Sequence, residues 1–231
     1  MHGLLRPRWL LGHVLVVGGI VVFVILGMWQ LQRHDEKTDL RDRVEQAMST
    51  SSVVPIEEVP KGAFRRITAV GEYQPRFESK VLRSRDGVSG YEVLTPLVLT
   101  DGTAVLVDRG WAQLDVDYTV GGALSPGPIV AEGLLWPAED AGEAIDLPEF
   151  IKRIDPRVFA SPTGLAFRSE YLVLIAQSPL GTADLVLPEV REISLGPHLG
   201  YAGQWFLFAG VTLVGYPLLL RRQIGFASTP G

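Results

Sequence analysis

The sequence predicts a membrane protein in which two transmembrane helices flank one β-rich domain outside the cytoplasm. The first observation is an apolar stretch over residues 9–29, whose only ionisable residue is His13. The second is residues 201–220, twenty residues without a charge, which is about the length that crosses a hydrocarbon core. The third is the chain between them, where short β-prone runs alternate with Gly and Pro over enough residues for one domain with its own core.

The first apolar stretch is expected to be a retained membrane anchor. Trp9 and Trp29 stand at its ends, where the aromatic belt of a spanning helix is found. The stretch is longer than the apolar region of a signal peptide, which is about 7–15 residues, and residues 27–30 are not a small-x-small cleavage site. The lipid bilayer is therefore an expected partner of this chain.

Arginines around the two spans indicate their orientation. Arg6 and Arg8 precede the first span, and Arg221 and Arg222 follow the second, which favours both termini in the cytoplasm. Basic residues just past the first span oppose this orientation. The expected order is a cytoplasmic N-terminus (1–8), a first span (9–29), an extracytoplasmic domain with a helical stem (30–197), a second span (198–220) and a cytoplasmic tail (221–231).

The middle of the chain predicts an α+β domain with an antiparallel sheet or a small barrel. Residues 91–99 and 104–109 are apolar runs joined through Asp101-Gly102, which is the strongest short-range signal for a β-hairpin. Further strands are expected over residues 66–70, 80–85, 129–135 and 170–177. Residues 31–48 are charged and helix-prone, so the first span is expected to continue as a stem. The acidic residues between positions 139 and 146 are expected to form a solvated loop.

Composition excludes several classes of function. The chain has no cysteine, which removes disulfides, thiolate metal sites and cysteine nucleophiles. Its 21 basic and 26 acidic residues leave no basic face, so nucleic acid is not an expected partner. We find no Ser-His-Asp order and no glycine-rich loop with a lysine. The protein is therefore not expected to be an enzyme.

A candidate binding layer lies at the outer ends of both spans. Tyr201 and Trp205 follow His198 at helical spacings of three and seven, on one stripe of the second span. Because the spans are antiparallel, the end of the first span is expected to lie level with His198. The expected layer consists of His198, Tyr201, Gln204, Trp205, Trp29 and Gln30, with the cations Arg33 and Lys37 just above it.

These residues are compatible with a haem site and with a plain membrane anchor. A haem requires an axial nitrogen, an apolar or aromatic wall and cations for its propionates, and the layer offers all three. An aromatic belt with a snorkelling Arg33 explains the same residues equally well. His13, inside the first span, is either a ligand or a hydrogen-bond partner of the other helix.

Three motifs, in the same order, resemble the surfeit-locus (Surf) family of cytochrome c oxidase assembly factors. The first is Gly27, Trp29, Gln30, Arg33 and Lys37; the second is Gly90, Tyr91, Thr95 and Pro96, followed by Val107-Asp108-Arg109-Gly110-Trp111; the third is His198, Leu199, Tyr201, Ala202, Trp205 and Phe206. Asp108 stands where the family usually has Asn. Residues 112–149 match only thinly, so nothing is transferred to them.

The resemblance implies a bacterial plasma-membrane factor that helps to assemble an aa3-type haem-copper oxidase. Such a factor would receive haem a and present it to the catalytic subunit, with haem a synthase as a further partner. His198 matches the family histidine thought to be an axial ligand of the haem iron, whereas Arg109, Gly110 and Trp111 carry no assigned role. No second histidine is expected in the layer, so a partner, a second copy or water is left as the other axial ligand.

Two alternatives of another class remain at this point. A haem-free chaperone would grip the oxidase subunit directly through its domain and spans. A retained accessory subunit would stay in the mature oxidase. The first predicts that Arg109 or Trp111 governs binding to the oxidase while His198 is dispensable, and the second predicts equimolar protein in the finished complex.

Overall fold

The structure is a computed structural model that describes residues 7–50, 52–60, 64–115, 124, 126–141, 149–181, 185–190 and 193–226. By its internal contacts the chain forms two compact units. The helical unit comprises Met1–Asp42 with Glu192–Gly231, and the β-domain comprises Arg43–Arg191. Each unit is described by itself below.

Two long helices bracket the chain and meet in the helical unit. Helix α1 spans Pro7–Ser49 and helix α3 spans His198–Phe226. Both are long and apolar enough to cross a membrane, which indicates a membrane protein. The stem expected over residues 31–48 is confirmed, because α1 continues without a break to Ser49. The second expected span and α3 begin at the same residue, His198.

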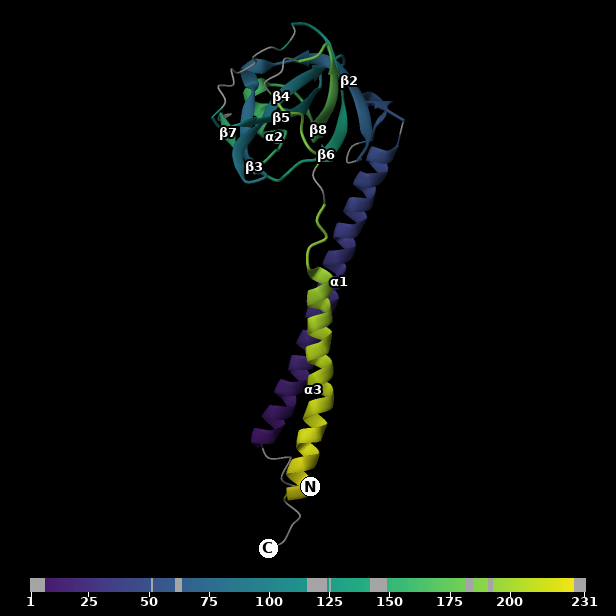
Figure 1. The fold of residues 1–231 in the computed structure, drawn as a ribbon, viewed down its shortest axis with the longest axis vertical. Helices are drawn as coiled ribbons and strands as arrows, with labels where there is room; N and C mark the ends of the chain where they lie inside the picture. Colours follow the sequence, from purple (N-terminus) through teal and green to yellow (C-terminus); the bar gives the residue numbers. More distant parts are fainter. Residues whose placement is uncertain are drawn as a thin grey trace. The chain divides into compact units, whose positions relative to one another are not determined.

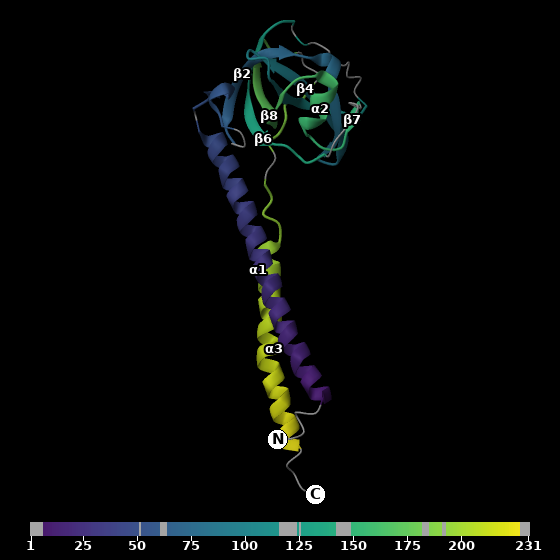
Figure 2. The ribbon, with the colours of Figure 1, turned by 180° about the vertical axis from the view of Figure 1, so that it is seen from behind.

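The helices of this unit run antiparallel and side by side, as both ribbon views show (Figures 1 and 2). Small residues allow the close approach: Ala202 and Ala209 of α3 are buried, and a Cβ added to Gly27 would lie 2.7 Å from the ring of Phe206. Contacts of this kind, between a small residue and a large one, favour helix association in lipid, where no hydrophobic force drives it.

Eight strands are found in the described part of the β-domain, and Figure 1 shows their sheet curling round on itself. They are β1 (Val54–Pro55), β2 (Arg66–Tyr73), β3 (Ser79–Arg85), β4 (Val88–Leu99), β5 (Ala104–Gln113), β6 (Ile129–Pro137), β7 (Phe150–Ile151) and β8 (Phe167–Ser178). Two 3-10 turns, η2 (Ile56–Glu58) and η3 (Pro75–Phe77), and helix α2 (Arg157–Thr163) complete it.

The sheet closes into a small barrel, which was one of the two expected forms. The strand order is β1-β2-β6-β8-β5-β4-β3-β7, and β2 also pairs with β4, so β2, β6, β8, β5 and β4 form a ring. The expected antiparallel pairing is found for only part of the sheet. Strands β5 and β8 pair in parallel, as do β1 with β2 and β3 with β7, which makes the sheet mixed.

The hairpin expected at Asp101-Gly102 joins β4 to β5. Gly102 has a φ of +82°, a conformation that glycine adopts without strain. The carboxylate of Asp101 accepts hydrogen bonds from the backbone N–H of Thr103 at 2.8 Å and from its hydroxyl at 2.7 Å. These hydrogen bonds, chiefly that of the hydroxyl, lower the pKa of Asp101.

Two hydrophobic cores lie on opposite faces of β5 and β8. Val105, Val107, Leu172 and Leu174 belong to one core, which is lined by the ring strands. The alternate positions, such as Leu106 and Val173, pack into a second core with α2. Strands that are buried on both faces are nearly continuous in apolar residues, as parallel neighbours usually are.

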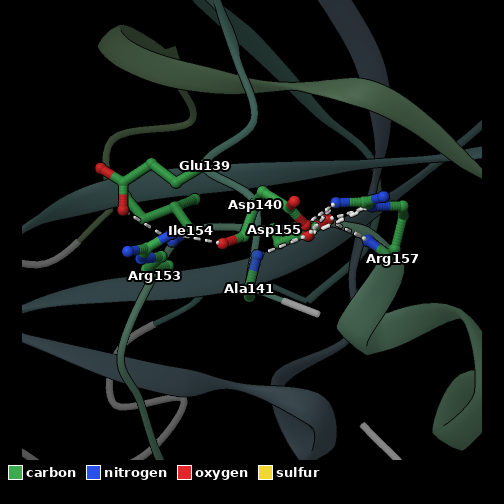
Figure 3. A network of polar contacts seen from close by, with 7 residues as sticks. All are labelled: Glu139, Asp140, Ala141, Arg153, Ile154, Asp155 and Arg157. Carbon is green, nitrogen blue, oxygen red and sulfur yellow. Dashed lines mark hydrogen bonds and ion pairs between the residues drawn. The ribbon is translucent and has the colours of Figure 1, made fainter. Parts of the chain in front are cut away.

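A network of ion pairs ties the segment after β6 to the start of α2 (Figure 3). The buried carboxylate of Asp155 accepts three hydrogen bonds from the guanidinium of Arg157, at 2.9, 3.1 and 2.7 Å. It also accepts hydrogen bonds from the backbone N–H groups of Arg157 and Ala141. Burial raises the pKa of Asp155, but the hydrogen bonds from Arg157 and Ala141 outweigh it, and the net pKa lies below its ordinary value.

The same network corrects one expectation from the sequence. Glu139 is not a solvated loop residue, because its mostly buried side chain accepts hydrogen bonds from Arg83 at 3.1 Å and from the N–H of Ile154. Asp140 is exposed but pairs with Arg157 at 2.7 Å. The other acidic residues of that cluster, Glu143 and Asp146, lie outside the described residues.

Candidate functional site

His198 is the first residue of α3 and is held there by the turn before the helix. Gly196 has a φ of +63°, and the N–H of Tyr201 donates to the carbonyl of Pro197 at 3.1 Å, which closes the first turn. Proline suits this place because its missing N–H would have no partner inside the helix. The turn therefore fixes the backbone of His198 at the end of the helical unit.

The imidazole of His198 makes one side-chain hydrogen bond, to Gln30 of α1. The Nδ1 atom lies 2.8 Å from the amide oxygen Oε1 of Gln30. An amide oxygen only accepts, so Nδ1 must carry the proton and donate it. In a neutral imidazole the other nitrogen, Nε2, then keeps its lone pair. This is the arrangement that metal-ligating histidines use, with one nitrogen oriented by an acceptor and the other directed at the metal.

A glycine lies next to the Nε2 edge of the His198 ring. A Cβ added to Gly196 would lie 3.3 Å from both Nε2 and Cδ2 of His198, in the tight range of contact. His198 itself is half-buried. The lone pair on Nε2 and the orienting amide of Gln30 are compatible with a role of His198 as a metal ligand.

The remaining residues of the expected layer separate into two groups. Trp29 and Tyr201 are 47% and 48% exposed, and Gln204 is also exposed. Ala202, which is 1% exposed, faces into the unit in place of Tyr201. Exposed aromatic side chains beside His198 can form the walls of a bound planar ligand, because their faces are not used in the helix contact.

Trp205 lies deeper than the expected layer. Its ring stacks on Phe23 of α1 with the centroids 5.8 Å apart, and it meets Phe208 edge-on at 5.9 Å. Phe23 precedes Gln30 by about two helical turns, so Trp205 contacts α1 well below the His198–Gln30 hydrogen bond. Trp205 is therefore a packing residue of the helix pair, and its contact with Phe23 could not be predicted from residue spacing.

The two expected cations lie on the same face of α1 as Gln30. Arg33 and Lys37 follow it by three and seven residues, which places them on one stripe. Arg33 sits over the ring of Trp29 at 5.9 Å and forms an exposed ion pair with Glu36 at 2.9 Å. Lys37 is exposed. Both cations can turn towards an anionic group because neither is fixed by burial.

A second polar pair joins the helices near their other ends. The hydroxyl of Tyr216 lies 2.6 Å from Nδ1 of His13, and the two rings meet edge-on at 5.6 Å. Of the two roles expected for His13, the hydrogen bond to the neighbouring helix is therefore found. The sequence analysis missed Tyr216, although it follows His198 by about five helical turns and so lies on the same face of α3.

Within the described residues, no group of three or more His, Asp or Glu side chains is placed to hold a metal ion. A bare ion such as zinc needs about four ligands from the protein and solvent. A haem iron already has four porphyrin nitrogens and needs only axial donors.

The β-domain carries a further set of expected residues, Arg109, Gly110 and Trp111, at the end of β5. Trp111 is mostly buried, and its backbone exchanges two hydrogen bonds with Val186, at 2.7 and 2.9 Å. A Cβ on Gly110 would lie 2.5 Å from the carbonyl oxygen of Val186, and a Cβ on Gly90 would lie 2.3 Å from the indole of Trp111. The two glycines thus make room for the tryptophan and for the segment that pairs with it.

Arg109 is buried within the domain, at 4% exposure. Its guanidinium forms an ion pair with Glu78 at 3.1 Å and lies 5.3 Å from the centre of the Tyr73 ring. Glu78 also accepts a hydrogen bond from the hydroxyl of Thr95. Burial raises the pKa of Tyr73, and the charge of Arg109 offsets part of that rise. These contacts give Arg109 a role in holding the domain together.

Comparison with known proteins identifies the family. The chain matches the SURF1 family over residues 17–210. It is 29% identical over 238 residues to proteins named uncharacterized SURF1-like protein from Mycobacterium bovis and Mycobacterium tuberculosis, covering 96% of this chain and 86% of each relative. A SURF1-like protein of Rickettsia bellii is 22% identical over 212 residues, covering 87% of both chains. The chain therefore belongs to the SURF1 family, whose members are known generally as oxidase assembly factors.

Proposed function

We propose that this protein is a membrane-bound assembly factor of an aa3-type cytochrome c oxidase, and that it holds haem a at His198 for the catalytic subunit. The observation that carries the proposal is the hydrogen bond from Nδ1 of His198 to Gln30, which leaves Nε2 available as a ligand. Membership of the SURF1 family supports the role in oxidase assembly. The protein acts as a carrier in this proposal and not as an enzyme.

Each residue of the site has a distinct task. His198 would supply a nitrogen ligand to the iron, and Gln30 orients its ring through the hydrogen bond to Nδ1. Trp29 and Tyr201 have exposed aromatic rings that would wall the porphyrin. Arg33 and Lys37 would neutralise its propionates, and the amide of Gln204 would donate to a substituent at its edge. When bound, the haem supplies the iron and the redox chemistry that the oxidase later uses.

The placement of this site follows from the expected membrane topology. With both termini in the cytoplasm, His198 and Gln30 lie at the outer ends of the spans, and the β-domain is extracytoplasmic. The site would then open towards the lipid and the outer leaflet of the bacterial plasma membrane. The catalytic subunit of the oxidase, and haem a synthase as the source of the haem, would be reached there.

The test is to measure haem a per polypeptide in detergent-purified protein from cells that make haem a. We expect His198→Ala to lower the haem content at least tenfold, because removal of an axial donor takes away the only bond from the chain to the iron. His13→Ala is the matched control, since it removes an imidazole from α1 near the other ends of the two helices, outside the site. An unchanged haem content in His198→Ala would refute the ligand assignment.

The same preparations separate the two alternatives. A haem-free chaperone would be colourless and would still co-purify with the catalytic subunit, with and without the His198→Ala substitution. A retained accessory subunit would be found in equimolar amount in the mature oxidase on a native gel. A carrier that acts during assembly is expected to be absent from the mature complex.

A further inference from the structure

A pocket in the β-domain carries a separate inference, which does not depend on the proposed function. The pocket has a volume of about 410 Å³. The last turns of α1 and the start of β2 form its walls. The residues that line it are Arg43, Gln46, Ala47, Thr50, Ser52, Val54, Phe64, Arg65 and Arg66. Three of these nine residues are arginines, and none is acidic.

Only one of the three arginines is neutralised. Arg66 pairs with Glu132 of β6, with its Nε donating at 2.6 Å. Within the described residues, Arg43 and Arg65 form no ion pair. The pocket therefore holds two uncompensated positive charges, in a chain whose formal net charge is −5. Two like charges converging on one cavity repel each other, and an anion between them removes that repulsion.

Three neutral side chains around the pocket, those of Gln46, Thr50 and Ser52, carry hydrogen-bond donors, and two of them are free to donate to a ligand. The hydroxyl of Thr50 donates to the carbonyl of Gln46 at 2.7 Å, so it has no proton for a ligand. The side chains of Gln46 and Ser52 make no hydrogen bond to any described residue. The amide of Gln46 and the hydroxyl of Ser52 can therefore donate to a bound group alongside the two guanidiniums.

The end of helix α1 opposes an anion only weakly. A helix C-terminus carries about half a negative charge, against two positive charges from Arg43 and Arg65. The carbonyl of Gln46 is also occupied, because it accepts from the N–H of Thr50 at 3.1 Å and from the hydroxyls of Ser49 and Thr50. The electrostatic balance of the pocket remains positive.

We propose that this pocket binds a phosphate group, held by Arg43 and Arg65 with Gln46 and Ser52 as further donors. A phosphate dianion matches the two charges, and planar guanidiniums from two elements of the fold can each donate to two of its oxygens. The ring of Phe64 meets that of Trp136 edge-on, with the ring centroids 5.3 Å apart. Phe64 therefore forms one apolar wall for the rest of the ligand. Free phosphate compounds and phospholipid headgroups present this same chemistry.

The experiment uses the full chain in detergent and two probes. Inorganic phosphate is titrated by calorimetry, and in parallel the protein is bound to vesicles of phosphatidylcholine with or without phosphatidylglycerol. We expect Arg43→Gln and Arg65→Gln each to weaken binding of at least one probe by about tenfold or more, which is the loss of a charge-assisted contact. Arg76→Gln is the matched control, because Arg76 is an exposed arginine of the same domain that lies over Phe77 outside the pocket.

The two probes distinguish the source of the phosphate group. Arginine-dependent binding of inorganic phosphate indicates a soluble ligand, and arginine-dependent binding of phosphatidylglycerol vesicles alone indicates a lipid headgroup. If neither probe binds, or if Arg76→Gln weakens binding as much as the pocket variants do, the proposal is overturned. The three substituted arginines, Arg43, Arg65 and Arg76, are exposed, so the variants are expected to fold. Circular dichroism checks this.

Discussion

The helical unit and the β-domain both carry family motifs, but they use them in opposite ways. In the β-domain, Arg109 and Trp111 are buried and held by several contacts each. In the helical unit, Trp29 and Tyr201 are about half exposed, and His198 keeps one nitrogen without a partner in the described structure. The motif residues of the β-domain are thus engaged by contacts within the fold, whereas those of the helical unit keep exposed faces and one ring nitrogen that a ligand can reach.

This contrast predicts the largest loss of stability at the buried ion pair. Arg109→Met leaves the carboxylate of Glu78 buried without its partner, which should cost about 3–5 kcal/mol of unfolding free energy. Native-state hydrogen exchange at the backbone amides of β5, measured on the full chain, reports this loss of unfolding free energy. The double variant Arg109→Met/Glu78→Leu should recover a large part of it, and Arg76→Met should have little effect. A stable Arg109→Met protein that no longer binds the oxidase would instead make Arg109 a partner contact.

A smaller loss is expected at the glycine beneath Trp111. A methyl group at Gly90 would overlap the indole, and Gly90→Ala should destabilise the domain by about 1–3 kcal/mol. Gly203 of α3 is the matched control in the other unit, because a Cβ there meets nothing within 4 Å. Gly203→Ala should be neutral or slightly stabilising in the same unfolding assay. An equal loss of unfolding free energy in Gly90→Ala and Gly203→Ala would contradict the claim that the motif of the β-domain is tightly packed and that of the helical unit is not.

The Asp155 network predicts a pH dependence of the β-domain. The pKa of Asp155 is lowered in the folded state, so its stabilisation is complete above the unfolded pKa, about 3.9, and is lost as the pH falls through the folded value. Asp155→Asn should cost roughly 1–2 kcal/mol at neutral pH, because charged hydrogen bonds become neutral ones. It should also flatten the unfolding free energy between about pH 5 and pH 2. A pH profile that the substitution leaves unchanged would show that other groups control acid unfolding.

The smallest effect on stability is expected at the candidate site itself. His198→Ala removes a half-exposed ring with one hydrogen bond, and it should change the unfolding of the β-domain by less than about 0.5 kcal/mol. Unfolding curves of the wild type and the variant should coincide while their haem contents differ. A large loss of stability in His198→Ala would indicate that the histidine has a structural role.

Local patterns in the sequence were sufficient for the six longer strands, the hairpin and the two apolar helices, but not for the two-residue strands β1 and β7. The Asp101-Gly102 turn and the apolar runs around it specify β4 and β5 through short-range physics alone. The parallel pairing of β5 with β8 was not predicted, because it joins segments far apart in the chain and leaves no local signal. The contacts of Glu139 with Arg83 and Ile154 were missed for the same reason.

The candidate site was predicted in part for a related reason. Antiparallel spans must bring the outer end of the first span, within α1, to the start of α3, so the nearness of Gln30 to His198 follows from topology. The sequence did not reveal which face of α3 meets α1. Small residues decide this, since Ala202 and Ala209 allow close packing, and Tyr201 is therefore turned outward while Trp205 reaches Phe23.

The most direct test of the account is the visible absorption spectrum of the purified full chain and of His198→Ala, each with and without added imidazole. The account predicts a reduced haem a band in the wild type, its loss in His198→Ala, and its return when imidazole replaces the missing side chain. A band of equal height in the wild type and His198→Ala without imidazole would contradict the claim that His198 is the ligand.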